Sequence, residues 1–245
     1  MKSESMSWTK WNKYRVMKKV KALSAYLPET RRCSYESLRD MLKRHGSVIV
    51  KPTGSYGGNG VYQIQTLKDD QIVRVHSGTK RQTYSNSEAV WNALKSRIGS
   101  SFIVQKRIEL GRVRGRPFDL RVMVQRRRGS GVWRVTGELA KVAGKGYIIT
   151  NVRRSGGRVI PAMDAFSAAI TSRSSRDILN EVRKVARQTA DCLVHRFPKQ
   201  REMGVDIAVD RSGRVWILEA NLRPAHSLFL KLKNKAMYHR IKSYL

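Results

Sequence analysis

The stretch MGVDIAVDRSGRVWILEANLRP, residues 203–224, decides how the rest of the chain is interpreted. Two apolar runs flank a polar, glycine-containing centre, a pattern that predicts a β-hairpin. The first run contains Asp206 and the second contains Glu219. A carboxylate inside an apolar strand is unfavourable unless it is paired or binds a metal, so both acids need an explanation.

The expected hairpin brings the two acids together. If Ser212–Gly213 forms a two-residue turn, Arg211 faces Arg214, and counting outward places Asp206 opposite Glu219. A slip of one residue would turn Asp206 to the other face of the sheet. The predicted register therefore depends on the turn.

Asn221 adds a third oxygen ligand to this pair. It lies two residues after Glu219, and alternate residues of a strand share a face. Two carboxylates and an amide oxygen suit Mg²⁺, which prefers hard oxygen ligands. The alternative explanation is that Asp206 and Glu219 form salt bridges with the abundant arginines.

Composition limits the classes of protein that fit. The chain has 245 residues, 40% of them hydrophobic, which is enough for one large domain or two small lobes. No apolar run approaches the roughly 18 residues of a membrane span, and the first residues do not resemble a signal peptide. We therefore expect a cytoplasmic protein without a membrane span. Cys33 and Cys192 are too few and too far apart for a disulfide framework.

The charge is strongly positive. Fifty basic residues against eighteen acidic ones give a net charge of +32, which favours polyanionic partners such as nucleic acid, anionic membrane or acidic polypeptide. The clusters RVRGR (112–116) and QRRRG (125–129) have no interleaved aromatic residues that would predict base stacking. A solvated basic surface is the alternative.

A second candidate site lies in VIVKPTGSYGGNGVYQI, residues 48–64. A predicted buried strand carries Lys51, and four glycines follow within seven residues. Glycine lets backbone N–H groups approach a phosphate closely. No GK[ST] follows, so this is not a P-loop; a plain hairpin turn is the alternative.

The remaining pattern predicts strands and helices in irregular succession, which indicates an α+β fold. Two helices are expected within residues 7–45, with Pro28 ending the first, Ser34 beginning the second and Gly46 ending it. The other expected elements are strands at 47–52, 61–66, 71–77, 80–85 and 101–110, helices at 86–98, 174–196 and 226–245, a turn at 68–70, a hairpin around 129–131 and a loop at 153–158.

The motifs of this chain, taken in their order along the sequence, resemble those of the ATP-grasp superfamily. After the lysine strand and glycine loop come IVQKRIEL (103–110), FDLRV (118–122), TNVRRSGG (150–157) and the opening hairpin. The N-terminal segments TKWNKYRVMKKVKALSAYLPET (9–30) and SLRDMLKRHGSVIVKP (37–52) are similar to those of the YheC/YheD-type endospore coat-associated proteins. The resemblance runs from about Trp8 to Pro224.

The resemblance implies an α+β ATP-grasp fold, with two lobes built on antiparallel sheets and ATP bound between them. On this basis we expect an N-terminal helical segment at 1–46, a smaller lobe with the glycine loop at 47–110, and a larger lobe with the metal site and a C-terminal helix at 111–245. The longer N-terminal region of many ATP-grasp enzymes is not expected here.

The resemblance also assigns roles to individual residues. The implied ATP-binding residues are Lys51 near the α-phosphate, Lys10 as an earlier lysine, Gly57, Gly58 and Gly60 over the β- and γ-phosphates, and Gln105, Lys106, Arg107 and Ile108 along the adenine. The implied Mg²⁺ ligands are Asp206, Glu219 and Asn221. The implied catalytic residues near the γ-phosphate and acceptor are Arg121, which forms a DxR pair with Asp119, and Lys141, Asn151 and Arg223, together with Arg153 and the Gly156–Gly157 loop.

The function implied is ATP- and Mg²⁺-dependent ligation of a carboxylate to an amine through an acyl phosphate. The basic charge favours an acidic acceptor, such as a Glu/Asp-rich peptide or protein. The alternative is a binding module that uses the fold to hold a polyanion or nucleic acid, with little turnover. The resemblance also implies a cytoplasmic protein associated with the forming spore coat.

Overall fold

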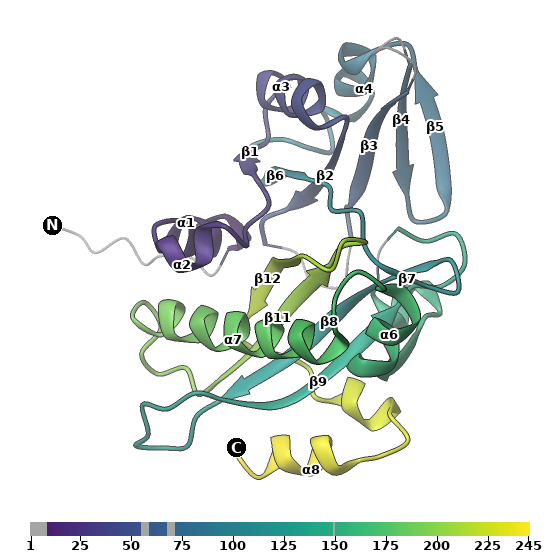
Figure 1. The fold of residues 1–245 in the computed structure, drawn as a ribbon. Coiled ribbons are helices and arrows are strands. Elements are labelled where there is room, and N and C mark those ends of the chain that lie inside the picture. Colours follow the sequence, from purple (N-terminus) through teal and green to yellow (C-terminus); the bar gives the residue numbers. More distant parts are fainter. Residues whose placement is uncertain (1–8, 55–58, 68–71, 149) are drawn as a thin grey trace, which may run out of the picture. The chain divides into compact units, whose positions relative to one another are not determined.

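The computed structural model describes residues 9–54, 59–67, 72–148 and 150–245. The chain divides into two compact units, which are considered separately (Figure 1). Unit 1 consists of Met1–Asn12, Pro28–Ile108 and Gly146–Ile149, and unit 2 of Lys13–Leu27, Glu109–Lys145 and Thr150–Leu245. The segment expected as one N-terminal helical part, residues 1–46, is thus divided between the two units.

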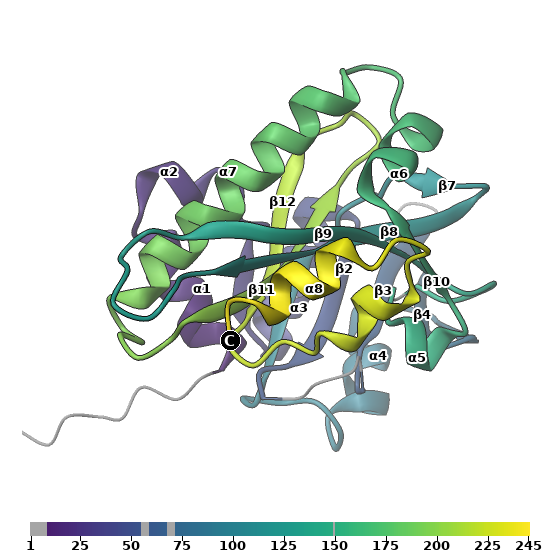
Figure 2. The ribbon, with the colours of Figure 1, turned by 90° about the horizontal axis from the view of Figure 1, so that it is seen from below.

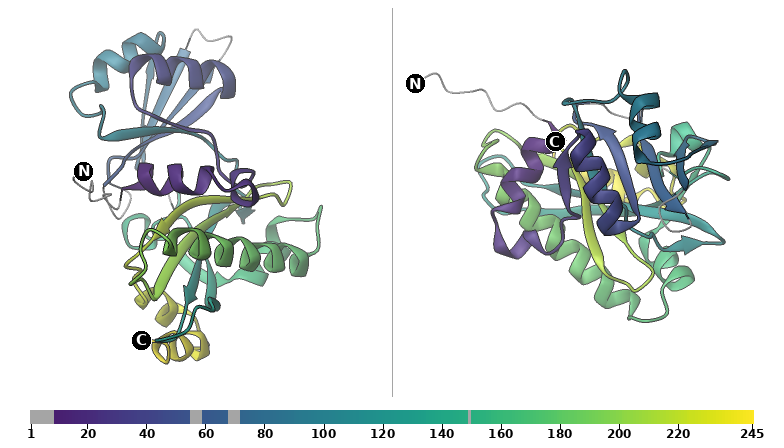
Figure 3. Two further views of the ribbon diagram at one scale, coloured as in Figure 1. Left: turned by 90° about the vertical axis from the view of Figure 1, so that its left-hand side faces the viewer. Right: turned by 90° about the horizontal axis from the view of Figure 1, so that it is seen from above.

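Unit 1 is built on a six-stranded antiparallel sheet with two helices on one face (Figure 3). Its elements are β1 (Thr30–Arg32), α3 (Tyr35–His45), β2 (Ser47–Pro52), β3 (Tyr62–Leu67), β4 (Ile72–Ser77), β5 (Lys80–Tyr84), α4 (Ser87–Leu94) and β6 (Phe102–Lys106). The strand order is β1-β6-β2-β3-β4-β5. Val48 and Val50 of β2 belong to the core that the helices cover, so Ile49 and Lys51 point to the other face.

Helix α3 begins and ends where the sequence predicts. The Ser34 side chain accepts a hydrogen bond from the Ser37 N–H at 3.2 Å, and the Ser37 hydroxyl is bonded to the Ser34 N–H at 2.9 Å. Gly46 follows the helix with φ of +65°, the left-handed conformation that favours glycine at a helix end. These two caps fix the start of β2 and therefore the position of Lys51.

Unit 2 contains the larger sheet, in the order β10-β9-β8-β11-β12, with β7 beside β8. Helices α6 and α7 cover one face, and η1 and α8 pack on the other (Figure 2). None of the helices described in either unit is long and apolar enough to span a membrane. The elements are α1 (Lys10–Lys18, beginning in unit 1), α2 (Lys21–Ser24), β7 (Arg112–Val113), β8 (Arg116–Gln125), β9 (Arg134–Val142), α5 (Val152–Ser155), β10 (Arg158–Pro161), α6 (Ala162–Ala169), α7 (Ser175–Val194), β11 (Glu202–Val209), β12 (Val215–Asn221), η1 (Ser227–Lys231) and α8 (Ala236–Lys242).

Two local expectations are wrong. The first predicted helix is interrupted at Val20, whose backbone is extended; Leu23 of α2 then packs in the same core as Met17 of α1. The expected loop at 153–158 instead contains the end of α5 and the start of β10. The expected turn at 68–70 lies outside the described residues.

Candidate functional site

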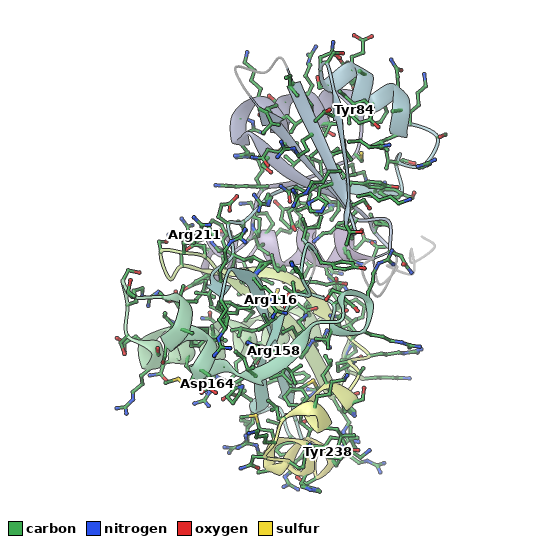
Figure 4. The ribbon with its side chains drawn as sticks, turned by 90° about the vertical axis from the view of Figure 1, so that its right-hand side faces the viewer. Tyr84, Arg116, Arg158, Asp164, Arg211 and Tyr238 are labelled. Atoms are coloured by element: carbon green, nitrogen blue, oxygen red, sulfur yellow. The ribbon has the colours of Figure 1, made fainter. Side chains whose placement is uncertain are left out.

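The β11–β12 hairpin places Asp206 opposite Glu219, as the sequence predicts, but by a different route. The Asp210 N–H donates to the Arg214 carbonyl at 3.0 Å, which makes the loop three residues long instead of two. The predicted pairing of Arg211 with Arg214 is therefore wrong, and Arg211 lies exposed in the loop (Figure 4).

A β-bulge between Ile207 and Asp206 shifts the pairing of β11 with β12 by one residue. Ile207 pairs with Ile217, whereas the next residue of β11, Asp206, pairs with Glu219. Leu218 is the extra residue: it lies between two paired positions of β12 and has no partner in β11. The longer loop shifts the register by one residue and the bulge shifts it back, so Asp206 and Glu219 lie on the same face of the sheet.

The Asp206 carboxylate is the centre of a cluster of ion pairs and hydrogen bonds. Arg121 donates from Nε to Oδ1 at 2.9 Å and from Nη2 to Oδ2 at 3.1 Å. Lys141 Nζ donates to Oδ1 at 2.9 Å, and the Asn221 amide donates to Oδ2 at 3.0 Å. These partners come from β8, β9 and β12, so the sheet order gathers residues that are distant in sequence. Four of the predicted catalytic and metal residues are thus brought together.

Asp119 of the DxR pair is a second acid in this cluster. It lies opposite Lys141 in the β8–β9 ladder, with 3.2 Å between Lys141 Nζ and Asp119 Oδ1. Burial raises the pKa of Asp119 to about 6, although Lys141 opposes the rise. Burial would also raise the pKa of Asp206, but Arg121 and Lys141 outweigh it and hold that pKa well below its usual range. Asp206 is therefore held in its charged form, whereas burial shifts the pKa of Asp119 towards neutral pH.

Lys13 joins the site although the sequence analysis did not select it. It is buried in unit 2, its Nζ donates to the Ala220 carbonyl at 2.5 Å, and it lies 4.0 Å from Glu219 Oε1. Lys13 and the buried Met17 lie four residues apart on one face of α1, but nothing in the sequence distinguishes Lys13 from the neighbouring lysines. The predicted Lys10 lies in unit 1 instead.

Gly204 is a second residue that the sequence analysis did not select. A Cβ atom at this position would lie 2.7 Å from Pro224 Cβ and 3.1 Å from Arg121 Cδ. The missing side chain therefore lets Arg121 pass closely over β11. A glycine inside an apolar strand often marks such a close approach, which was the signal in the sequence.

The residues present fit a magnesium ion. Among the described residues, no three His, Cys, Asp or Glu side chains gather as a metal site. The set is instead two carboxylates, Asp206 and Glu219, facing each other across neighbouring strands, with the Asn221 amide bonded to Asp206. Mg²⁺ usually takes one or two protein carboxylates and completes its shell with water and substrate phosphate. The chemistry of this donor set suits that ion.

Lys51, the predicted nucleotide lysine, is held by a chain of hydrogen bonds within unit 1. Its Nζ donates to Gln105 Oε1 at 2.8 Å, and Gln105 Nε2 donates to Thr30 Oγ1 at 2.9 Å. The Thr30 hydroxyl in turn donates to the Pro28 carbonyl at 2.9 Å. Gln105 is buried and hydrogen-bonded on both sides, so it orients the Lys51 ammonium.

The glycine loop is described only at its ends. Gly57 and Gly58 lie outside the described residues. Gly60 has φ of +67°, and a Cβ there would lie 3.0 Å from Pro52 Cγ. Glycine is therefore required where the loop returns to β3.

The segment Gln105–Ile108 uses part of its backbone inside unit 1. The Lys106 N–H donates to the Glu29 carbonyl at 2.8 Å, and the Arg107 N–H donates to the Ser47 carbonyl at 3.2 Å. Any contact of these two residues with a base must therefore use other backbone groups. Nearby, the Lys10 N–H donates to the Thr53 carbonyl at 2.9 Å, which ties the start of α1 to the end of β2.

The predicted acceptor loop is tied to the end of β9. The Asn151 side-chain oxygen accepts from the Arg154 N–H at 2.9 Å and so caps α5. The Ser155 hydroxyl donates to the Asn151 carbonyl at 2.8 Å and accepts from the Gly144 N–H at 3.1 Å. Asn151 thus has a structural role of its own. Arg223, two residues beyond the hairpin, is exposed.

The two sheets and the site define an ATP-grasp protein. The structure of N5-carboxyaminoimidazole synthase from Aspergillus clavatus, in complex with ADP and 5-aminoimidazole ribonucleotide, has a similar fold, with a TM-score of 0.55 and 11% identity. That similarity covers 91% of this chain and 46% of the other. More narrowly, the chain belongs to the family described as YheC/D like ATP-grasp, which matches residues 3–245. The resemblance and the fold class predicted from the sequence are confirmed.

Two proteins of Bacillus subtilis (strain 168) are similar to this chain in sequence. The chain is 24% identical over 226 residues to endospore coat-associated protein YheC, and 27% identical over 229 residues to endospore coat-associated protein YheD. Each similarity covers 91% of this chain, but only 61% of YheC and 49% of YheD. The chain therefore spans about half to three fifths of the length of these relatives.

Proposed function

We propose that this chain is an ATP- and Mg²⁺-dependent ligase that activates a carboxylate as an acyl phosphate and joins it to an amine. The observation that carries the proposal is the cluster in unit 2 in which Asp206 holds both Arg121 and Lys141 and lies opposite Glu219. Ligation of this kind must bring two anions together, and such a cluster supplies the positive charge.

The proposed reaction has two steps. A carboxylate oxygen of the substrate attacks the γ-phosphorus of ATP and releases ADP; the amine then attacks the acyl carbon, releases phosphate and loses a proton. Arg121 and Lys141 would oppose the repulsion between the carboxylate and the phosphate. Bound Mg²⁺ would supply further positive charge to the phosphate oxygens. No covalent protein nucleophile is required.

The Asp206 carboxylate pairs with Arg121 and Lys141 and is also a proposed ligand of the metal. Asp206 accepts hydrogen bonds on both oxygens, and one of them comes from Lys141 at 2.9 Å. A metal ligated by Asp206 and Glu219 would compete with Lys141 for that carboxylate. Asp206 and Glu219 would hold the ion, and Lys141, which also pairs with Asp119 at 3.2 Å, would keep its ammonium beside the site to contact phosphate.

Unit 1 would contribute to binding the nucleotide. Lys51 is oriented by the Gln105 amide, which accepts its hydrogen bond without carrying a negative charge. An acidic residue at position 105 would instead form an ion pair with Lys51 and weaken its attraction for phosphate. We assign the α-phosphate to Lys51, the β- and γ-phosphates to the glycine loop, and the adenine to the segment Gln105–Ile108.

The acceptor and the place of action are also part of the proposal. The net charge of +32 favours an acidic acceptor, such as a Glu/Asp-rich peptide or protein. The relatives YheC and YheD are described as endospore coat-associated. We propose that this chain acts in the cytoplasm and associates with the forming spore coat.

Thermal stabilisation by ATP with Mg²⁺ tests the proposal. A ligand that binds only the folded state adds about 2.7 kcal/mol at a hundredfold excess over its Kd. We expect a shift in the wild type that needs both ATP and Mg²⁺, a loss of its metal-dependent part in Glu219→Gln, and weaker ATP binding in Lys51→Ala. Glu181→Gln, which removes a carboxylate from an ion pair with Arg173, is the matched control and should keep the full shift. No shift in the wild type, or a full shift in both site variants, would refute the nucleotide site.

The charge also supports the alternative of a polyanion-binding module with little turnover. Measurement of ADP release distinguishes the ligase from the binding module, because only the ligase hydrolyses ATP in the presence of its substrates. Screening acidic peptides with a panel of amines should reveal ADP formation that depends on both substrates. A nucleotide shift without any such turnover would favour the binding module.

A further inference from the structure

A second surface of unit 2 carries a concentration of positive charge. It consists of residues 126–134 in the β8–β9 connection, residues 195–201 between α7 and β11, and residues 240–245 at the end of α8; we call it the basic end surface. These segments contain nine lysines and arginines, seven of which are arginines, and no aspartate or glutamate. All of these residues are described by the structure.

Hydrogen bonds show that the three segments form one surface. The Arg126 N–H donates to the Arg201 carbonyl at 3.0 Å, and Arg126 Nε donates to the Gln200 carbonyl at 3.0 Å. Arg201 Nη2 donates to the Tyr244 carbonyl at 2.9 Å. Figures 1 and 2 show the β8–β9 connection, the segment after α7 and the chain end at the same end of unit 2.

The guanidinium groups on this surface are fixed without being neutralised by side-chain carboxylates. Arg126 donates to backbone carbonyls, Arg201 donates to the Tyr244 carbonyl and to the Leu245 oxygen at 3.2 Å, and Arg240 Nε donates to the Thr136 carbonyl at 2.7 Å. Within the described parts of the chain, none of these three arginines has an ion pair with aspartate or glutamate. Backbone carbonyls hold the side chains in place but leave the positive charge available to an anion.

The fold also supplies an aromatic ring that the sequence pattern did not place here. The guanidinium of Arg127 lies over the Tyr244 ring, 4.9 Å from its centroid, although the two residues are far apart in sequence. Tyr244 is half-buried and Arg127 is exposed. Aromatic rings and arginine planes are the groups on which unstacked bases pack in single-stranded nucleic acids.

We propose that the basic end surface binds single-stranded nucleic acid, with arginines on the phosphate backbone and the Tyr244–Arg127 pair against a base. Arginine forks match phosphate geometry. An acidic polypeptide would use the charge but has no planar base to pack on the ring. The surface is separate from the ligase site, because Arg126, the residue that follows β8, lies five residues beyond Arg121, about 17 Å at the usual rise of a strand.

Salt-dependent binding of a labelled oligothymidylate of about 20 nucleotides, longer than the site of one typical binding fold, tests the proposal. The test variant combines Arg128→Gln, Arg196→Gln and Lys199→Gln, three exposed positions outside the ligase site. For single strands each phosphate contact contributes about 0.7 to the slope of log affinity against log salt, so the slope should fall by about 2. Thermal stabilisation by ATP with Mg²⁺ should not change.

The matched control removes the same charge elsewhere, with Lys18→Gln, Arg97→Gln and Arg176→Gln, all exposed. It should bind the oligonucleotide with nearly wild-type affinity and slope; an equal loss would show that only net charge matters and would overturn the surface assignment. Tyr244→Leu should weaken oligothymidylate binding about fivefold or more, the usual effect of losing one stacked base. No effect of Tyr244→Leu, or equally tight binding of poly-L-glutamate, would overturn the assignment to nucleic acid.

Discussion

Asp206 of β11 and Glu219 of β12 face each other because β12 contains one residue more than a regular ladder needs. Counting from the Ile207–Ile217 pair, a regular ladder would place Leu218 opposite Asp206. Glu219 would then point to the other face of the sheet. The proposed metal site therefore depends on a backbone irregularity as much as on the acids themselves.

The register predicts which position accepts a carboxylate. Glu219→Gln should lose the Mg²⁺-dependent part of the thermal stabilisation by ATP. Adding Leu218→Glu to that variant should not restore it, because the bulged residue is not opposite Asp206. Restoration in the double variant would mean that Leu218 faces Asp206 and that the bulge is wrongly placed.

Asp206→Asn should destabilise the protein as well as abolish turnover. The substitution keeps the shape of the side chain but leaves Arg121 and Lys141 buried without their shared counter-charge. Removing one partner of a buried ion pair typically costs about 3–5 kcal/mol in the free energy of unfolding. Urea denaturation without nucleotide measures this change.

Two further variants control that measurement. Asp164→Asn, at an exposed position of α6 (Figure 4), should change the free energy of unfolding by less than about 0.5 kcal/mol. Asp206→Asn combined with Arg121→Met should be more stable than Asp206→Asn alone, because Arg121 loses its ion-pair partner Asp206 whereas Lys141 keeps Asp119 at 3.2 Å. If the single variant is as stable as the wild type, the ion pairs at Asp206 do not stabilise the fold.

Local sequence features predicted much of this fold. Ser34 and Gly46 mark the ends of α3, and the strand predicted at 47–52, which carries Lys51, is β2. These features depend on hydrogen bonds and side-chain directions within a few residues, so they can be recognised without knowing the tertiary structure. The sequence also predicted that Asp206 lies opposite Glu219, which the structure shows, although two errors in the predicted register cancelled.

Features that depend on distant parts of the chain could not be predicted in this way. The bulge at Leu218 is not marked by glycine or proline. Lys13 looks like any other lysine of a basic helix until β12 is packed against it. Tyr244 meets Arg127 only because the C-terminal segment returns to the β8–β9 connection. Spacing along the sequence carries none of this information.

Asp119 predicts a specific dependence of stability on pH. Its pKa is about 6 in the folded protein against an ordinary value of 3.8. Between these values the folded state holds a proton that the unfolded state has lost, so the free energy of unfolding falls as pH rises and levels off above about pH 6. The difference corresponds to about 3 kcal/mol, since a tenfold change in proton affinity is worth about 1.4 kcal/mol.

Asp119→Asn isolates this contribution. Urea denaturation without Mg²⁺, at a series of pH values from 4 to 7, should show that the difference in stability between wild type and variant changes across this range. Asp206 does not interfere, because its lowered pKa contributes stability that is lost only as pH falls below its ordinary value. A constant difference between the two proteins would show that Asp119 is fully ionised throughout and that burial does not raise its pKa.

Gly204→Ala should disturb the site without removing any functional group. The added Cβ would lie 2.7 Å from Pro224 Cβ and 3.1 Å from Arg121 Cδ, so either the proline or the arginine must move. Overpacking of this kind typically costs about 1–3 kcal/mol, and displacement of Arg121 should also lower the rate of ADP formation. Gly131→Ala, in the exposed β8–β9 connection where nothing lies within 4 Å of the new atom, is the matched control and should leave both quantities nearly unchanged. Equal behaviour of the two variants in urea denaturation and ADP release would show that Arg121 does not need the space that Gly204 provides.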